Sequence, residues 1–459
     1  MSKRKRSNRG WCGSERPVLE PNAAGIDVGA REMYVAVPPD RDAEPVRVFG
    51  TFTSELQALV KWLQQCRIST VAMESTGVYW IPLFQMLEEA GIRPCVVNAR
   101  GLRNVPGRRT DWHDCQWLQY LHTVGLLRAA FRPPQEICAV RSIWRQRSEL
   151  VAMAAQHVQH MQKALTQMNL QIHHVISDIT GVTGLAVIDA VLRGERNPET
   201  LAQLREPSIQ ASPETIRASL LGDWRHEHIF VLRQSRSLYQ SYCEQIRACD
   251  REVEALLGKL PPRADPNALP PPAKPARKKK RTAGAVTFDY RSEAYRLFGV
   301  DLTRIPGLQA NVMGLFSEIG NDLSRFPTAA HFASWLALCP DNDKSGGQVL
   351  WRGVRNIQQR AGQLFRLSAH SLHHSQTRLG QFLRRMKAKL GPKAATTATA
   401  HKLAVIFYTL ITKQREYDES IWAASEEENR KRLQNKLKRQ ASLLGFQLVP
   451  VAVSGEVPQ

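Results

Sequence analysis

The chain has 459 residues, 43% of them hydrophobic, and its 63 Lys and Arg side chains outnumber 42 Asp and Glu, giving a formal net charge of +21. This length predicts two or three domains, and the positive charge favours a polyanionic partner, first of all nucleic acid. No apolar run approaches the roughly 18–20 residues of a membrane span, and no apolar segment follows the basic N-terminus, so neither a membrane protein nor a secretory signal is predicted. The eight cysteines form no CxxC pair, which is typical of reduced cytosolic thiols.

The first part of the chain predicts a basic disordered arm at residues 1–22 and an α/β domain at residues 23–130. The expected elements are strands at 25–28, 33–37 and 46–52, a helix at 55–65, a strand at 70–73, a helix at 79–90, a strand at 93–97 and a helix from about 111 to 127. The first three strands are close enough in sequence for a hairpin meander. The later strands alternate with helices, which favours parallel pairing. This order is that of a ribonuclease H-like (RuvC-like) fold.

Four carboxylates occupy places that this fold brings to one edge of its sheet. Asp27 lies on the first strand, Glu74 ends the fourth, and Asp111 and Asp114 share one face of the last helix because they are three residues apart. Such carboxylates repel one another unless cations bridge them, and a two-magnesium phosphoryl-transfer site requires a cluster of this kind. Taken singly, each has an ordinary alternative as a strand-end or helix-capping acid. The four together favour the metal site.

Residues 140–258 predict a long helical coiled-coil region. Apolar side chains recur every seven residues from 144 to 172, and a second series at 154, 161, 168 and 175 follows the last four of them by three residues. A similar alternation appears between residues 239 and 256, after a break at 180–184. The two helices could pair within one chain or across a dimer, and the pattern leaves both open.

The rest of the chain divides into three segments. Residues 259–286 combine proline runs with Ala-Arg-Lys-Lys-Lys-Arg, which predicts a linker that either rests on phosphates or is simply solvated. Residues 287–412 predict a mainly helical unit, with a polar, glycine-rich loop between residues 339 and 348. Residues 413–459 predict a charged tail.

These residues resemble the DEDD transposase family of bacterial insertion sequences, RuvC-like recombinases that include the pilin-inverting enzyme and members guided by a bridge RNA. The resemblance runs in order through Gly-Ile-Asp at 25–27, Met-Glu-Ser-Thr-Gly at 73–77, Val-Pro-Gly-Arg-Arg-Thr-Asp at 105–111, Asp-Ile-Thr-Gly-Val-Thr-Gly at 178–184, Ile-Pro-Gly at 305–307, Glu-Ile-Gly at 318–320, Phe-Pro-Thr at 326–328 and the loop at 340–346. It covers nearly the whole chain. Each motif alone is weak, and their order carries the resemblance.

The resemblance implies a helical, serine-bearing transposase domain at residues 287–412, with Ser345 as nucleophile in a phosphoserine intermediate. Metals beside a serine hydroxyl would activate it, whereas without the resemblance Ser345 is more simply part of a Ser-Gly turn. The implied cofactor is Mg²⁺, as two ions with Mn²⁺ as a substitute. The implied metal ligands, which are also catalytic, are Asp27, Glu74, Asp111 and Asp114. The expected nucleic-acid contacts are Arg108, Arg109, Lys344, Gly346, Arg352 and Arg355.

The resemblance further implies double-stranded donor and target DNA, a structured guide RNA, a homo-oligomer (dimer or tetramer), no membrane partner, and a cytoplasmic, nucleoid-associated location in bacteria. Two other functions fit the residues. A RuvC-like nuclease would hydrolyse DNA junctions with water at the acidic cluster, and Ser345 would be dispensable. A non-catalytic RNA-binding scaffold with a degenerate nuclease fold would not need four mutually repelling carboxylates, which argues against it.

Overall fold

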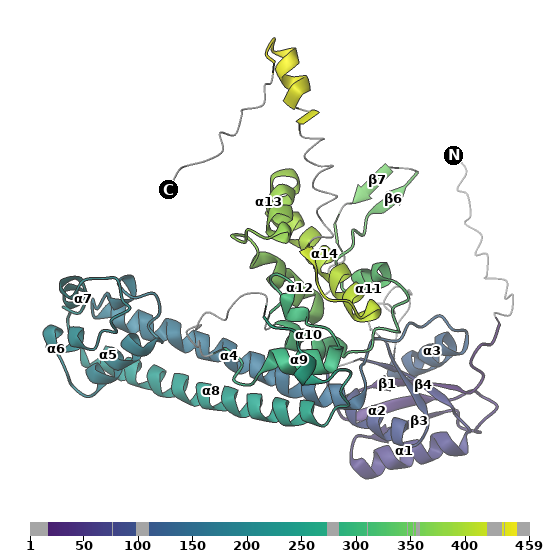
Figure 1. Ribbon diagram of the computed structural model, residues 1–459. Coiled ribbons are helices and arrows are strands. Elements are labelled where there is room, and N and C mark those ends of the chain that lie inside the picture. The colour runs from purple at the N-terminus through teal and green to yellow at the C-terminus, as the bar shows by residue number, and fades with distance from the viewer. Residues whose placement is uncertain are drawn as a thin grey trace, which may run out of the picture. The chain divides into compact units, whose positions relative to one another are not determined.

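The chain forms two compact units, Met1–Arg132 and Pro133–Gln459 (Figure 1). The computed structural model describes residues 17–75, 77–97, 110–272, 284–309, 311–346, 348–351, 353–354, 359–419, 434–435 and 437–447. Among these residues, no helix has both the length and the apolar character needed to cross a membrane.

The described residues of the first unit form a five-stranded mixed sheet and three helices (Figure 1). Its elements in chain order are β1 (Ala23–Val28), β2 (Glu32–Ala36), β3 (Val46–Gly50), α1 (Thr53–Gln65), β4 (Thr70–Glu74), α2 (Trp80–Glu89), β5 (Arg93–Val97) and α3 (Asp111–Thr123). The strand order is β3-β2-β1-β4-β5, with β2 antiparallel to β1 and β3, and β4 parallel to β1 and β5. The predicted element order is confirmed, and the sheet is compatible with a ribonuclease H-like fold.

The central strands are apolar throughout because the elements packed on the sheet bury them. Ala24 and Ile26 of β1 and Val71 of β4 are fully buried, as expected for strands covered on both faces. Two predicted boundaries are wrong by a few residues. The third strand ends at Gly50, since the extended residue Phe52 precedes the first turn of α1, and α3 ends at Thr123, before Gly125 takes a positive φ of 69°.

Helices dominate the second unit. They are α4 (Gln135–Gln167), α5 (Val182–Leu192), α6 (Pro198–Gln203), α7 (Pro213–Ser219), α8 (His226–Gly258), α9 (Tyr290–Phe298), α10 (Asn311–Ile319), α11 (Ala329–Trp335), α12 (Arg360–His370), α13 (Arg378–Leu390) and α14 (Pro392–Lys413), with a strand pair β6 (Asp343–Ser345) and β7 (Gln348–Trp351). The long helices α4 and α8 lie side by side, and α5, α6 and α7 connect them at one end (Figure 1).

The two heptad-patterned helices therefore pack against each other within one chain. Met161 and Leu165 of α4 and Ile246 and Val253 of α8 are buried, as the apolar periodicity predicts. The predicted seam extends too far, however, because α4 ends at Gln167 and Asn169 then adopts a left-handed conformation with φ 55°. The apolar residues that follow Asn169 belong to a separate short turn, and they are buried there.

A buried ion pair lies between α4 and α8. Arg147 Nε donates to Asp250 Oδ1 at 2.5 Å, and the Asp250 side chain is fully buried. The other carboxylate oxygen accepts the backbone N–H and the hydroxyl of Thr287, each at 3.1 Å, while Arg147 Nη2 donates to the Gly284 carbonyl at 3.1 Å. One buried carboxylate thus joins both long helices to the chain that follows the predicted linker.

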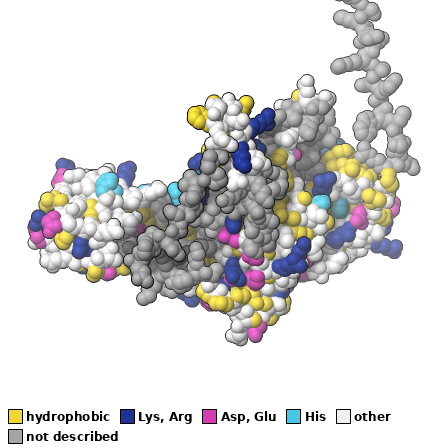
Figure 2. All heavy atoms as spheres, turned by 45° about the horizontal axis from the view of Figure 1, so that its top comes forward, with side chains coloured by type: hydrophobic (Ala, Val, Ile, Leu, Met, Phe, Trp, Pro, Cys, Tyr) yellow, Lys and Arg dark blue, Asp and Glu magenta, His cyan; other side chains and the backbone are white. Residues whose placement is uncertain are grey.

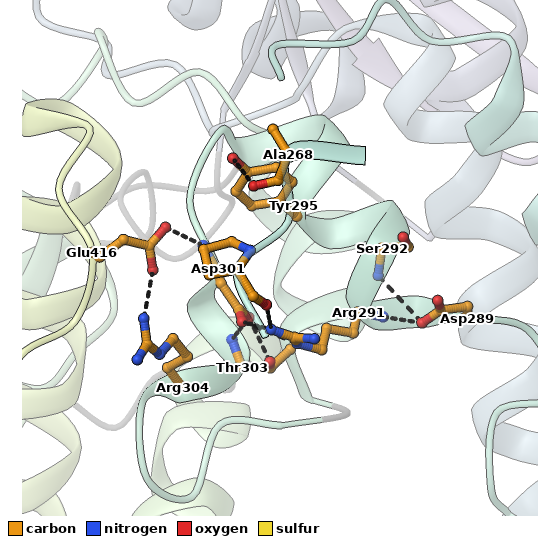
Figure 3. A network of polar contacts seen from close by, with 10 residues as sticks. Ala268, Asp289, Arg291, Ser292, Tyr295, Asp301, Thr303, Arg304 and Glu416 are labelled. Carbon is orange, nitrogen blue, oxygen red and sulfur yellow. Dashed lines mark hydrogen bonds and ion pairs between the residues drawn. The ribbon is translucent and has the colours of Figure 1, made fainter. Parts of the chain in front are cut away.

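A second buried carboxylate, Asp301, fixes the start of the helical bundle (Figure 3). Asp301 Oδ2 accepts Arg291 Nη2 at 2.6 Å, and Oδ1 accepts the Thr303 hydroxyl at 2.5 Å. Its backbone N–H donates to Glu416 at 3.3 Å, and Glu416 also pairs with Arg304 at 3.7 Å. The network connects α9 with the residues that follow α14, which closes this part of the unit.

Candidate active site

Neighbouring strands position the first two predicted acids. Ile26 of β1 lies opposite Met73 of β4 in the parallel pair, so the residues that follow them, Asp27 and Glu74, lie next to each other at the same edge of the sheet. Both side chains are partly buried. Strand pairing alone therefore brings together two carboxylates that are 47 positions apart in the sequence.

A close contact between α3 and β1 brings in the other two acids. A Cβ atom at Gly25 would lie 2.2 Å from the Gln119 nitrogen and 2.3 Å from the Cys115 carbonyl oxygen, so only glycine lets the backbone of α3 approach the strand this closely. Gly25 has a structural role here that the sequence motifs did not predict. A glycine inside an otherwise apolar strand is the signal that indicates close backbone approach.

The first turn of α3 presents Asp111 and Asp114. Thr110 precedes the helix in an extended conformation, and the negative side chains suit the N-terminus of the helix dipole. Asp111 is exposed and Asp114 is partly buried. Beneath them Cys115 is fully buried, and burial raises the pKa of its thiol to about 12, so this cysteine stays neutral and packs as a small apolar side chain.

The electrostatics of Asp27 connect all four acids. The pKa of Asp27 is raised from 3.8 to about 6, most of all by burial and then by the negative charges of Asp111, Glu74 and Asp114, in that order. A carboxyl group responds in this way when like charges surround it without compensation. The structure thus brings the four predicted acids close enough, at the edge of the sheet, for the other three to act on the charge of Asp27.

The chemistry of these four acids suits a divalent cation. Carboxylate oxygens are the ligands that Mg²⁺ prefers, and the raised pKa of Asp27 reflects negative charge that a cation would neutralise. Within the described residues, no group of three or more His, Cys, Asp or Glu side chains is already arranged to hold a metal ion. The donor set fits Mg²⁺, and ligand geometry would have to form on binding.

The raised pKa of Asp27 predicts a pH-dependent stability. The folded protein holds this proton more tightly than the unfolded chain, so the free energy of unfolding falls as the pH rises from about 4 to about 6. Without metal, Asp27→Asn should equal the wild type near pH 4 and exceed it by on the order of 2 kcal/mol above pH 7. Urea unfolding in EDTA at both pH values measures this difference, and an equal difference at the two pH values would contradict the assignment.

Ser345 belongs to the second unit and lies on a hairpin. The sequence analysis predicted a loop here, which is wrong for its second half: β6 and β7 form an antiparallel pair in which Ser345 lies opposite Gln348. Gly346 has a φ of 55°, which suits a tight hairpin turn, and the side chain of Ser345 is exposed. The predicted nucleophile is therefore accessible at the tip of a short hairpin.

Several predicted nucleic-acid contacts lie outside the described residues. They are Arg108, Arg109, Arg352 and Arg355, together with the side chain of Lys344. Gly346, the remaining member of that set, lies exposed beside Ser345.

Comparison with known families relates both units to one kind of protein. Residues 24–170 match a model of DEDD transposases of the IS110 type, described as "Transposase", and residues 301–382 match one described as "Transposase IS116/IS110/IS902 family". The first match contains all four acids, and the second contains the β6–β7 hairpin. No curated protein matches the chain. Two models of one family thus match in order along the sequence, and both matches support a DNA transposase of the IS110 type.

Proposed function

We propose that this transposase cuts and exchanges DNA strands through a phosphoserine intermediate at Ser345, with Mg²⁺ bound by Asp27, Glu74, Asp111 and Asp114. The observation that carries the proposal is that Asp27 and Glu74 lie side by side at one edge of the sheet, where the charges of Asp111, Glu74 and Asp114 act on Asp27. Acids drawn from two strands and one helix would raise the energy of the fold for no gain if no cation bound between them.

Each part of the chain would have a defined task. Mg²⁺ bound at the acids would neutralise charge on the scissile phosphate and favour the ionised form of an attacking hydroxyl. Ser345 Oγ would attack phosphorus, forming an Oγ–P bond while a P–O bond of the DNA breaks and the departing DNA oxygen takes up a proton. Gly346 would let the DNA backbone approach the hairpin tip closely, because it has no side chain. The phosphoserine keeps the bond energy for joining to a second DNA end.

The proposal also includes guidance by a structured RNA, action on donor and target duplexes, and assembly into a dimer or tetramer. The net charge of +21 supports polyanionic partners. We further infer that α4 and α8 form a coiled coil. Because their buried seam is used within one chain, assembly would use other surfaces, such as the exposed apolar side chains Met153, Phe230 and Leu238.

Ser345→Ala tests the nucleophile. We expect the variant to lose the covalent protein–DNA adduct that survives denaturing electrophoresis, while its affinity for the guide RNA stays within about twofold of the wild type. Ser371→Ala is the control and should keep the adduct; it removes the hydroxyl of another exposed serine in the second unit, one that donates to the Ser368 carbonyl at 2.8 Å. An adduct that persists in Ser345→Ala rules out this serine. Ligatable nicks in place of blocked ends would favour hydrolysis by water, the junction-nuclease alternative.

A further inference from the structure

One long segment of the second unit contains no acid at all. The 72 residues from Lys344 to Arg415 contain 14 Lys and Arg side chains and neither Asp nor Glu. At the average of the whole chain, 42 acids in 459 residues, a segment of this length would contain about six or seven. The segment begins within the hairpin of Ser345, directly after its first residue Asp343, and includes the helices α12, α13 and α14, which pack together around α14.

The middle helix of this group exposes several positive charges. Leu379 and Leu383 of α13 are buried. Arg385, Lys387 and Lys389 are exposed, and these three side chains are what we call the α13 cationic face. Arg385 and Lys389 share one side of the helix, whereas Lys387 lies on the side that contacts His373. Arg385 and Lys389 are one helical turn apart, so their side chains emerge about 6 Å from each other.

The charged groups of the α13 cationic face contact neutral side chains rather than carboxylates. Lys387 Nζ lies 2.8 Å from His373 Nε2, and this ammonium group lowers the pKa of His373. The guanidinium of Arg385 lies 5.6 Å from the centre of the Phe382 ring, and Lys402 Nζ lies 4.6 Å from the same ring. Within the described part of the chain, neither Arg385, Lys387 nor Lys389 forms an ion pair with an acid.

Cations elsewhere in the second unit are neutralised differently. Arg145 makes a two-pronged contact with Glu318 at 2.7 and 2.8 Å, and Arg236 does the same with Asp189 at 2.8 and 3.0 Å. Where α5, α6 and α7 connect the long helices, acidic and basic side chains lie close together on the visible surface (Figure 2). The α13 cationic face therefore departs from the mixed charge of its own unit, and its unneutralised charge is available to an external polyanion.

We propose that the α13 cationic face binds the phosphate backbone of the duplex DNA that flanks the strand attacked at Ser345. Exposed Lys and Arg side chains suit phosphates, which they contact without reading sequence. The choice of DNA rests on the proposed function. The chain leading into the hairpin is anchored on α12, where Arg366 Nη2 donates to the Ala337 carbonyl at 2.8 Å, and α12 and α13 both pack on α14, so the hairpin and the α13 cationic face are carried by one helical group.

The test compares two variants of the full chain that lose equal charge. Arg385→Gln/Lys387→Gln/Lys389→Gln removes the α13 cationic face, and Lys163→Gln/Arg247→Gln/Arg251→Gln removes three exposed cations of α4 and α8. Both carry Ser345→Ala, so binding is measured without strand cleavage. We expect the first variant to bind a 30-base-pair duplex at least about tenfold more weakly, with a salt dependence shallower by about two to three in log K against log [salt]. The second variant should stay within about twofold of its parent.

Equal affinities and equal salt slopes for the two variants would overturn the proposal. Weaker binding of a folded RNA with unchanged binding of duplex DNA would also overturn it, because the occupant would then be RNA. Lys389→Glu guards against misfolding of the triple variant, since this single exposed change should weaken DNA binding more than Lys389→Gln at an unchanged melting temperature. The binding result does not depend on an adduct at Ser345, so failure of the proposed function would be seen separately.

Discussion

Asp27→Asn is expected to slow DNA strand cleavage by about 10³-fold without unfolding the protein. The substitution keeps the shape of the side chain and removes one charged ligand from the proposed metal site, and the loss of one preorganised charged contact to a transition state typically costs this much. The fold itself should not suffer, because burial and three nearby negative charges already disfavour the ionised form of Asp27. A loss of activity accompanied by equal or higher stability distinguishes a functional acid from a structural one.

Cleavage of DNA under single-turnover conditions, with Mg²⁺ and guide RNA present, measures this effect. The matched control is Asp40→Asn, which changes an acid with a 72% exposed side chain in the same unit and should leave the rate unchanged. Cleavage at the wild-type rate in Asp27→Asn would exclude this acid from the site. Lower stability of the variant at neutral pH would contradict the electrostatic account of Asp27.

Asp250→Ala is expected to lower the free energy of unfolding by about 3–5 kcal/mol. It would leave the Arg147 guanidinium buried without its counter-charge, and the backbone N–H of Thr287 would lose its acceptor. Replacing both charges, as in Arg147→Met/Asp250→Leu, should recover most of this loss, because removing a whole buried pair avoids the uncompensated charge. Urea unfolding followed by far-ultraviolet circular dichroism reports mainly on the helices of this unit.

The control for the Arg147–Asp250 pair lies in the same helical unit. Asp189 and Arg236 form a two-pronged contact in which the acid is 36% exposed, so Asp189→Ala should cost about 1 kcal/mol or less. Similar losses for Asp189→Ala and Asp250→Ala would mean that burial is not what makes the Arg147–Asp250 pair important.

The elements of the first unit were predictable from sequence because each has a local signal. The segment around Leu56, Leu59 and Leu63 repeats at helical spacing, while the runs ending at Asp27 and Glu74 are short, apolar and followed by polar residues. The grouping of the acids also followed, because parallel strands of this topology end at a common edge. Their influence on the pKa of Asp27 required the packed structure, since it depends on how closely α3 approaches β1.

Other features had no local signal. Arg147 occupies the position one heptad before Ala154, and a charge there interrupts the apolar series, so nothing in the pattern predicted a buried arginine. The strands β6 and β7 are only three and four residues long, too short for a periodic pattern to stand out. The acid-free segment is recognised only by the absence of Asp and Glu, and no sequence motif marks such an absence.

The chain on both sides of the Pro- and Lys-rich segment is tied to the second unit. Before it, Arg296 of α9 donates to the carbonyls of Leu257 and Leu260 at 2.6 and 2.8 Å, and Arg291 donates to Pro270. After it, Gly284 and Thr287 are held by the buried ion pair of the long helices. The described residues on either side of 273–283 are therefore each anchored, and lengthening a connection between two anchored points costs little entropy. A single protease cut there would leave two polypeptides that stay associated, which makes this segment a natural place to insert a reporter domain.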